Sequence, residues 1–267
     1  MKPESILYFE KVRALTEART PFVSVTLVAS RGHVPQELGA KILVTENGLE
    51  VGTVGGGRVE AKAIEKAKEQ LAGDSLRAHE LVTWNLQRDV GMTCGGEVTF
   101  FFEAFFCRPW DVVVFGAGHV AQSLVRILLG LDCSLTCIDP REEWLAQLPD
   151  GPNLTKVCTD DMPSKVTQLK SDAFVMLMTQ GHKFDVPILE ACLRRKAFPY
   201  LGVIGSQVKG ITVRKELIEK GLPPDLVNSI RCPMGLPLGD NSPNEIAISM
   251  VAELLQTRDL LRKREPS

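Results

Sequence analysis

The segment that most constrains this chain is an apolar strand that runs into a glycine-rich turn and then into a helix. Residues 112–121 read VVVFGAGHVA. Gly116 permits the tight turn, Gly118 lets the backbone approach a phosphate, and Ala121 lets helix and strand pack closely. Free amides at the start of the helix favour an anion. The segment predicts a nucleotide-type binding site; the alternative is a glycine turn that serves only helix–sheet packing.

Two further residues bear on this predicted site. Asp139 follows Gly116 by 23 positions, at the end of the next predicted strand. An acidic residue at this place commonly meets a ribose. His119 stands at the first position of the predicted helix, where it either touches a ligand or is exposed and idle.

Strands and helices alternate regularly through the second half of the chain. Apolar strand-like segments at 111–115, 134–138, 173–178 and 200–204 alternate with helical patterns at 119–129, from 142, at 186–195, around 212–220 and at 244–262. Such alternation indicates parallel βαβ units. We therefore expect residues 108–267 to form a Rossmann-like domain with a doubly wound parallel sheet.

The first half has a different pattern. A helix is predicted over 4–18, a strand over 22–28, a hairpin over 40–45 and 50–54 around Asn47-Gly48, a helix over 58–71, and strands over 78–86 and 97–105. These elements indicate an α+β domain with a largely antiparallel sheet, so the whole chain is predicted to be an α/β protein. Pro109 cannot continue a central strand, and we place the domain boundary after Cys107, giving domains 1–107 and 108–267.

A second glycine cluster lies in the first half, where Gly55, Gly56 and Gly57 separate a predicted strand from a helix. Successive amides in such a turn can form an anion-binding concavity, and Arg58 can add a charge-assisted contact. The alternative is a strained strand–helix turn with Arg58 on a solvated face.

Cys94 is the cysteine that most suggests chemistry. It stands beside Gly95 and Gly96 in a predicted loop, so its thiol is sterically open, and a nearby cation or metal would favour the thiolate. The alternative is a small loop residue. The seven cysteines contain no CxxC pair, which argues against a zinc ribbon or a disulfide scaffold and favours a reducing cytoplasm.

A third group of candidates follows the later strands. Thr179, Gly205 and Ser206 come directly after predicted strands, and ligands bind outside the carboxyl ends of parallel strands. His182 and Asp185 open the next helix as an acid/base pair, as metal ligands or as helix caps. Lys209 is either a cation for a ligand or a surface charge.

Composition excludes two classes of protein. The 267 residues carry a formal net charge of −2, whereas a dedicated nucleic-acid binder usually has a basic face. No apolar run approaches the roughly 18 residues of a membrane-spanning helix. We expect neither a nucleic acid nor a membrane as partner.

Together these motifs resemble the xanthine dehydrogenase accessory protein family, XdhC/CoxI, over nearly the whole chain. The resemblance rests on an ordered set of segments: 39–41 (GAK), 52–57 (GTVGGG), 94–97 (CGGE), 115–121 (FGAGHVA), 139–141 (DPR), 200–206 (YLGVIGS) with Lys209, 232–236 (CPMGL) and 243–247 (PNEIA).

The resemblance implies a maturation factor for molybdenum hydroxylases. Such a protein binds molybdopterin cofactor, keeps it during sulfuration by a cysteine desulfurase and delivers it to an apo-enzyme of the xanthine dehydrogenase type. It implies an N-terminal domain joined to a Rossmann domain, and a homodimer. The residues expected to hold the cofactor are Gly55, Gly56, Gly57, Cys94, Gly95, Gly116, Gly118, His119, Asp139, Arg141, Thr179, His182, Gly205, Ser206 and Lys209. The Cys94 thiol is expected near molybdenum or sulfur.

One segment departs from the family pattern, and two other functions compete. Members usually read Gly-Ser-x-Pro-Arg before the Gly-Ala step, but residues 32–36 read GHVPQ here, which puts a phosphate contact at this place in doubt. The main alternative is an NAD(P)-dependent oxidoreductase, since the glycine turn and Asp139 fit a dinucleotide. A regulatory module that binds another nucleotide is the third possibility.

Overall fold

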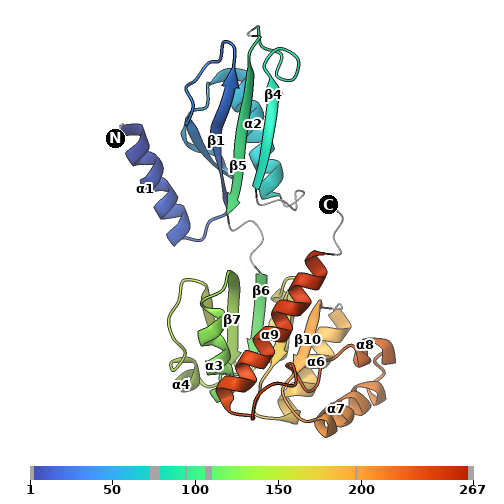
Figure 1. Cartoon of the computed structure of the whole chain (residues 1–267). Helices are drawn as coiled ribbons and strands as arrows, with labels where there is room; N and C mark the ends of the chain where they lie inside the picture. Colours follow the sequence, from blue (N-terminus) through green and yellow to red (C-terminus); the bar gives the residue numbers. More distant parts are fainter. Residues whose placement is uncertain (1–2, 73–78, 94, 106–109, 196–197, 264–267) are drawn as a thin grey trace. The chain divides into compact units, whose positions relative to one another are not determined.

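Each half of the chain builds a five-stranded sheet of its own (Figure 1). The structure, a computed structural model, describes residues 3–72, 79–93, 95–105, 110–195 and 198–263. The chain divides into two units, Met1–Arg108 and Pro109–Ser267. The predicted boundary after Cys107 lies outside the described residues.

The first unit has an antiparallel sheet in the order β3-β2-β1-β5-β4. Antiparallel pairing was predicted for this half, and it is confirmed. The elements in chain order are α1 (Pro3–Glu17), β1 (Phe22–Arg31), β2 (Lys41–Thr45), β3 (Gly48–Gly52), α2 (Gly57–Leu71), β4 (His79–Asn85) and β5 (Glu97–Phe105).

Helices pack on both faces of this first sheet. Val23, Val25 and Leu27 of β1 join the buried cluster that includes Val59 and Ala63 of α2. Successive strand residues point to opposite faces, and accordingly Phe22 lies in a second cluster with Tyr8 and Leu15 of α1. The Tyr8 hydroxyl also lies 2.7 Å from the Ser24 hydroxyl. The apolar and hydroxyl side chains of α1 therefore fix it on the face opposite α2.

The second unit has a parallel sheet in the order β10-β9-β6-β7-β8. This is the doubly wound arrangement that the alternating pattern predicted. Its elements are β6 (Trp110–Phe115), α3 (His119–Leu128), β7 (Cys133–Asp139), α4 (Glu142–Leu145), β8 (Leu154–Cys158), α5 (Met162–Lys165), a 3-10 turn (Val166–Gln168), β9 (Phe174–Leu177), α6 (His182–Arg195), β10 (Tyr200–Val203), α7 (Gln207–Glu219), α8 (Pro224–Asn228) and α9 (Pro243–Arg262).

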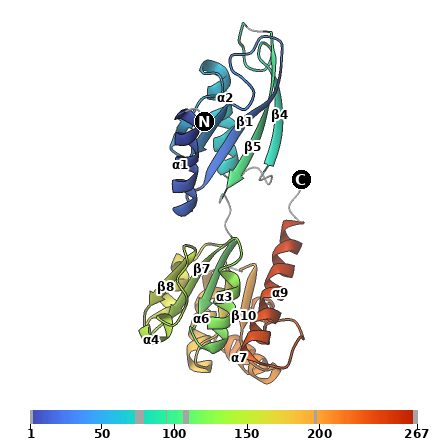
Figure 2. The ribbon, with the colours of Figure 1, turned by 60° about the vertical axis from the view of Figure 1, so that its left-hand side comes forward.

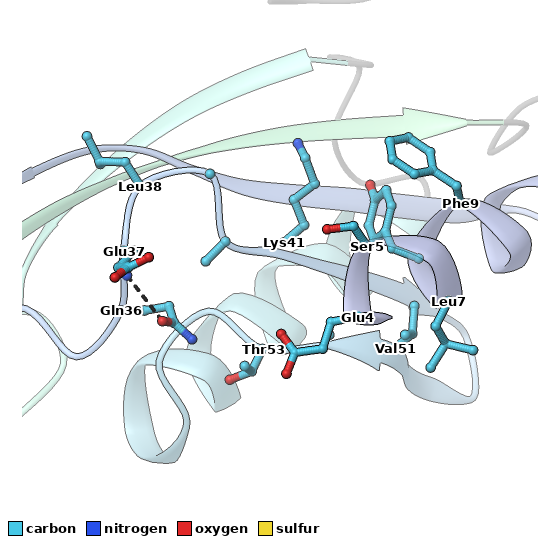
Figure 3. A pocket seen from close by; sticks show the side chains of 14 residues that line it. Glu4, Ser5, Leu7, Phe9, Gln36, Glu37, Leu38, Lys41, Val51 and Thr53 are labelled. Carbon is cyan, nitrogen blue, oxygen red and sulfur yellow. Dashed lines mark hydrogen bonds between the residues drawn. The ribbon is translucent and has the colours of Figure 1, made fainter. Parts of the chain in front are cut away.

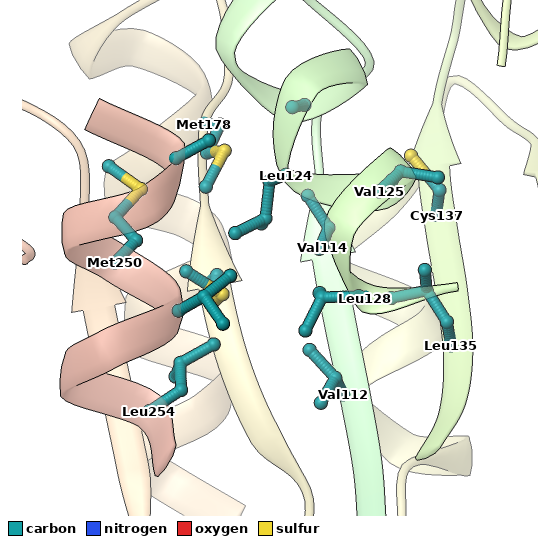
Figure 4. Packing of buried hydrophobic residues seen from close by; sticks show 14 of the residues in the cluster. Val112, Val114, Leu124, Val125, Leu128, Leu135, Cys137, Met178, Met250 and Leu254 are labelled. Atoms are coloured by element: carbon teal, nitrogen blue, oxygen red, sulfur yellow. The ribbon is translucent and has the colours of Figure 1, made fainter. Parts of the chain in front are cut away.

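The central strand β6 is apolar except for Asp111, because both faces of the sheet are covered. Val112 and Val114 pack with α3 and α9 (Figure 4), whereas Val113 and Phe115 pack with α6 and α7 on the other face. Figure 2 shows α3 and α6 with the sheet from another side. A strand buried on both faces has a continuous apolar sequence rather than an alternating one.

Some element bounds differ from the sequence prediction. Strand β8 and the short helices α5 and α8 were not predicted. Helix α6 begins at His182, the residue named above as opening the helix although its apolar pattern starts only at 186, and α7 begins at Gln207 rather than 212. The added residues of α6 include three polar ones in its first turn, and the start of α7 is fixed by Ser206, whose hydroxyl accepts from the Lys209 amide at 3.3 Å. Apolar periodicity cannot detect helix starts of this kind.

Helix α9 holds the segment 231–235, which follows α8, in place through hydrogen bonds. Its buried Glu253 accepts from the Tyr200 hydroxyl at 2.6 Å, from Arg231 Nη1 at 2.8 Å and from the Gly235 amide at 2.8 Å. Arg231 also forms an isolated parallel β-bridge with Gly202 of β10. One carboxylate thus joins the edge of the sheet, the 231–235 segment and the last helix.

Candidate functional site

The predicted site residues of the second unit follow the carboxyl ends of four parallel strands. Gly116 and Gly118 follow β6, Asp139 ends β7, Thr179 follows β9, and Gly205 follows β10. The strand order reverses between β6 and β9, and open α/β sheets bind ligands at such a switch point. The topology therefore brings these residues to one edge of the sheet.

The two glycines after β6 have different roles. Gly116 has φ +108°, and a Cβ there would lie 2.2 Å from the carbonyl oxygen of Met178, so this turn requires glycine. Gly118 is the N-cap of α3 with φ −68°, and a Cβ there would meet nothing within 4 Å. No described side chain caps α3, so its first amides remain open to an acceptor.

Asp139 does not present a free carboxylate to this turn. It is 1 % exposed, and its Oδ2 accepts from the Ala117 amide at 2.7 Å and from Arg141 Nη2 at 2.8 Å. Its Oδ1 accepts from the amide and from Nε of Arg141, both at 2.9 Å. Burial raises the pKa of Asp139, but the hydrogen bonds from Arg141 and Ala117 outweigh burial and hold that pKa below its ordinary value. The expected contact to a ribose would have to compete with these partners.

Arg141 reaches across the switch point. The Gln180 amide, oriented so that its oxygen faces Arg141, accepts from Nη1 at 2.9 Å. The guanidinium lies 4.7 Å from the centre of the Trp144 ring, and the His119 ring meets the same indole edge-on at 5.1 Å. Sequence reasoning missed Gln180 and Trp144, although Gln180 directly follows the predicted Thr179.

The crevice at this edge is closed in the described conformation. The space lined by Gly116, Asp139, Thr179, Gln180 and three neighbours measures about 10 Å³, far below the several hundred Å³ of a typical ligand pocket. This space is too small for a ligand of nucleotide size, and neither Gly118 nor Arg141 lines it.

An acid/base pair was one of three roles open for His182 and Asp185, and in the described chain each of them has another partner instead. His182 Nε2 lies 2.5 Å from Glu216 Oε2. Asp185 is fully buried, accepts from the Thr179 hydroxyl at 2.7 Å, and lies 2.6 Å from Lys209 Nζ. That ion pair lies outside hydrogen-bond angles and leaves Asp185 Oδ2 without a hydrogen bond in the described chain.

Lys209 is therefore paired with a buried carboxylate and is not an isolated surface charge. Its Nζ also donates to the Ile204 carbonyl at 2.8 Å. Gly205 makes room for it, since a Cβ at Gly205 would lie 2.4 Å from Lys209 Cδ. Thr179, Asp185 and Lys209 together tie the ends of β9 and β10 to the starts of α6 and α7.

The glycine cluster of the first unit is filled from within. Glu60 Oε2 accepts from the Thr53 hydroxyl at 2.6 Å, from the Val54 amide at 3.0 Å and from the Gly56 amide at 3.3 Å. Arg58 donates to the carbonyl of Gly91 instead of facing an anion. The turn at Gly55, Gly56 and Gly57 thus binds an acidic side chain of its own helix.

The cysteines differ sharply in exposure. Cys94 lies outside the described residues, while open space surrounds the neighbouring Gly95. Burial raises the pKa of both Cys137 and Cys192 to about 12, whereas Cys158 is exposed. Within the described ranges, His, Cys, Asp and Glu form no group of three that could hold a metal ion. No helix in these ranges is long and apolar enough to cross a membrane.

A cavity in the first unit was not predicted. It measures about 520 Å³ and lies where the start of α1, the segment before β2 and the end of β3 meet (Figure 3). Its lining includes Gln36, which stands where the family pattern has arginine, as well as Lys41 and Thr53 from two of the quoted motifs. The motifs therefore contained residues of this cavity, but the sequence did not show that these residues line one cavity.

Comparisons with known proteins agree with these motifs. The model of the XdhC Rossmann domain matches residues 112–254, and that of the XdhC and CoxI family matches residues 15–83. The uncharacterized protein YqeB of Escherichia coli K12 is 31% identical over 255 residues, which are 94% of this chain and 46% of YqeB. The chain thus spans about half the length of that relative.

Two further proteins resemble the chain along most of its length. The molybdenum cofactor insertion chaperone PaoD of Escherichia coli K12 is 25% identical over 276 residues, covering 88% of this chain and 83% of PaoD. A crystal structure described as a xanthine dehydrogenase from Bacillus halodurans shares the fold, with a TM-score of 0.50, 20% identity and 96% of each chain covered. Because the Rossmann-domain model alone covers more than half of the 267 residues, the chain belongs to the XdhC family.

Proposed function

We propose that this chain binds molybdenum cofactor as its cargo and inserts it into an apo-enzyme of the xanthine dehydrogenase type. The similarity to PaoD, which extends along most of both chains, supports a role in cofactor insertion. We expect it to act in the cytoplasm.

The observation that carries the proposal is the uncapped start of α3. The corresponding turn before α2 is occupied by Glu60, whereas no side chain caps the turn at Gly118 in the described structure. Amides at a helix start together with the helix dipole attract a phosphate, and molybdopterin carries one. Gly118 leaves the space that a phosphate needs.

Arg141 is the second element of the proposed site. Asp139 holds its guanidinium on one side and Trp144 stacks against it, so its orientation is fixed before a ligand arrives. In this proposal the cofactor displaces Gln180 from Arg141, opens the crevice and gains a charge-assisted contact. Thr179, His182, Ser206 and Lys209 then support the walls of the site.

The finer steps of maturation are also proposals. We infer that the chain keeps the cofactor while a cysteine desulfurase supplies sulfur, that the Cys94 thiol takes part near molybdenum, and that the chain acts as a homodimer. Replacing Cys94 by serine should lower bound molybdenum or client activity, with exposed Cys158→Ser as the matched control. Equal values for both variants would remove Cys94 from the mechanism.

The competing function as an NAD(P)-dependent oxidoreductase fits the geometry less well. A dinucleotide enzyme uses the acidic residue after the second strand to bind ribose hydroxyls. Here both oxygens of Asp139 already accept from Ala117 and Arg141. The Asp139–Arg141 pair therefore favours recognition of an anion over recognition of a ribose.

The decisive experiment compares the wild type with Gly118→Asp after expression in a molybdenum-replete host. Aspartate is a preferred N-cap residue, so this variant should keep or raise thermal stability while its carboxylate occupies the turn. Gly130→Asp adds the same charge at the other end of α3. Molybdenum and pterin fluorescence should be lost from Gly118→Asp only.

Two outcomes would overturn the proposal in different ways. Retention of cofactor by Gly118→Asp would show that the α3 turn is not the site. A wild type that carries a nicotinamide, and neither molybdenum nor pterin, would favour the oxidoreductase; another nucleotide alone would favour a regulatory module.

A further inference from the structure

The cavity of the first unit has the size and the walls of a small-molecule site. Its volume of about 520 Å³ falls within the range of roughly 300–1,000 Å³ that holds ligands in proteins. Three separate segments line it: the first turns of α1, residues 36–41 and residues 51–53. None of the proposed function's steps uses this cavity.

Side-chain interactions hold its walls in place before any ligand binds. Tyr8 is fixed through its hydroxyl to Ser24, and Lys11 pairs with Glu50 at 2.7 Å. These contacts hold α1 against the sheet. At the other end, Thr53 is held by its hydrogen bond to Glu60. A preformed cavity loses less free energy to ordering when a ligand binds.

The lining combines an apolar rim with polar groups of both signs. Leu7, Phe9 and Leu38 are 56 %, 57 % and 60 % exposed, although they are large and apolar. The Glu4 carboxylate extends from α1 toward Gln36 and Thr53 in Figure 3. No described residue forms a hydrogen bond or ion pair with the Glu4 side chain.

Lys41 adds a donor to this wall. Its Nζ donates to the Thr26 hydroxyl at 2.7 Å and lies 5.9 Å from the centre of the Tyr8 ring. Within the described ranges no carboxylate lies at ion-pair distance from Lys41. The cavity lining thus combines a carboxylate acceptor, ammonium and amide donors, and exposed apolar side chains.

We propose that this cavity binds a flat ring with a 2-amino-4-oxopyrimidine edge, as found in a pterin. The amino group and the adjacent ring N–H of such an edge donate to a carboxylate, for which Glu4 is the candidate. The ring carbonyl accepts from the Gln36 amide, which lies on the same side of the cavity as Glu4 in Figure 3. The choice of a pterin over guanine, which has the same edge, rests on the proposed cofactor-binding function.

The test uses the full chain and two fluorescent probes that differ at one group. Pterin has the 2-amino group, whereas lumazine has a carbonyl oxygen there and would face Glu4 with an acceptor. We expect pterin to bind at least about tenfold more tightly than lumazine, since hydrogen bonds to a charged group carry this much discrimination. Glu4→Gln should lower the affinity for pterin and reduce the difference in affinity between pterin and lumazine, because an amide both donates and accepts.

Glu10→Gln is the matched control, since Glu10 is an exposed residue of the same helix outside the cavity lining. Equal binding of both probes, or pterin affinity unchanged in Glu4→Gln, would overturn the inference. Tighter binding of GMP than of pterin would replace the pterin by a guanine nucleotide. If the wild type bound molybdenum but not free pterin, the proposed role of this cavity in pterin binding would be refuted, and the proposed function would stand.

Discussion

Arg141 donates two parallel hydrogen bonds to Asp139, from Nε to Oδ1 at 2.9 Å and from Nη2 to Oδ2 at 2.8 Å. The two residues are separated by Pro140 alone, so the pair forms within one short turn after β7. The pair neutralises a carboxylate that is 1 % exposed and places a guanidinium at the edge of the crevice.

This pair predicts a pH dependence of stability. The folded pKa of Asp139 lies below its unfolded value, so its contribution is complete above the unfolded pKa and is lost as pH falls through the folded pKa. Below about pH 4 the urea midpoint should therefore fall. Asp139→Asn should lower the free energy of unfolding by about 1–3 kcal/mol at neutral pH. The urea midpoint of this variant should fall less steeply than that of the wild type as the pH is lowered. An unchanged acid slope in this variant would contradict the assignment.

The two glycines of the α3 turn should respond differently to alanine. Gly116→Ala places a Cβ 2.2 Å from the Met178 carbonyl oxygen, and we expect a loss of about 3 kcal/mol or more. Gly118→Ala meets nothing within 4 Å and should cost no more than about 1 kcal/mol. Thermal unfolding of both variants measures the difference. Similar losses of stability in the two variants would contradict the close approach of Gly116 to the Met178 carbonyl.

Removal of Glu60 should open an anion site that is closed in the wild type. Glu60→Ala should lose about 1 kcal/mol, as for other lost helix caps, and sulfate should stabilise this variant more than the wild type. Glu65→Ala, on the exposed side of α2, controls for the change in net charge. If sulfate raised the melting temperature of all three proteins equally, the turn would not be the binding place.

The buried pair of Asp185 and Lys209 predicts strong coupling. Lys209→Met leaves a fully buried carboxylate without its cation, which typically costs about 3–5 kcal/mol. In the double variant Asp185→Asn/Lys209→Met the loss should be well below the sum of the single losses. A double-mutant cycle from urea unfolding tests this, and additive losses would mean that the two charges do not interact.

Thiol labelling should separate the cysteines by burial. Near pH 8, alkylation of the native chain should modify Cys158 before the other described cysteines, because Cys158 is exposed and they are buried. Cys137 and Cys192 should react only after unfolding, since burial raises the pKa of each to about 12. Peptide mass spectrometry reads each site separately. Modification of native Cys192 as rapidly as of Cys158 would contradict the packing described for α6.

Elements with strong apolar periodicity could be predicted from sequence, whereas the edge strand β8 could not. Strand β6 and helix α9 bury apolar side chains along their length and lie close to their predicted places. Strand β8 (Leu154–Cys158) pairs only with β7, at the edge of the sheet, and none of its residues is fully buried. Its hydrophobic signal is therefore weak.

For the candidate site, the motifs predicted positions but not partners. The Gly116 turn lies where the pattern placed it. That Asp185 would pair with Lys209 rather than His182 depends on how α6 and α7 pack side by side, and a single sequence carries no information on that. Likewise, nothing in the spacing of Gly56 and Glu60 shows that the carboxylate folds back onto the turn.

The carboxylate of Glu253, which joins Tyr200, Arg231 and Gly235, also sets an order of events during synthesis on the ribosome. Every strand of the first unit is complete by Phe105, so that unit can fold while later residues are still being added. The second unit cannot close one face of its sheet until α9 has emerged, because Met250 and Leu254 fill the core beside α3. A nascent chain stalled before residue 243 should therefore expose that face to chaperones.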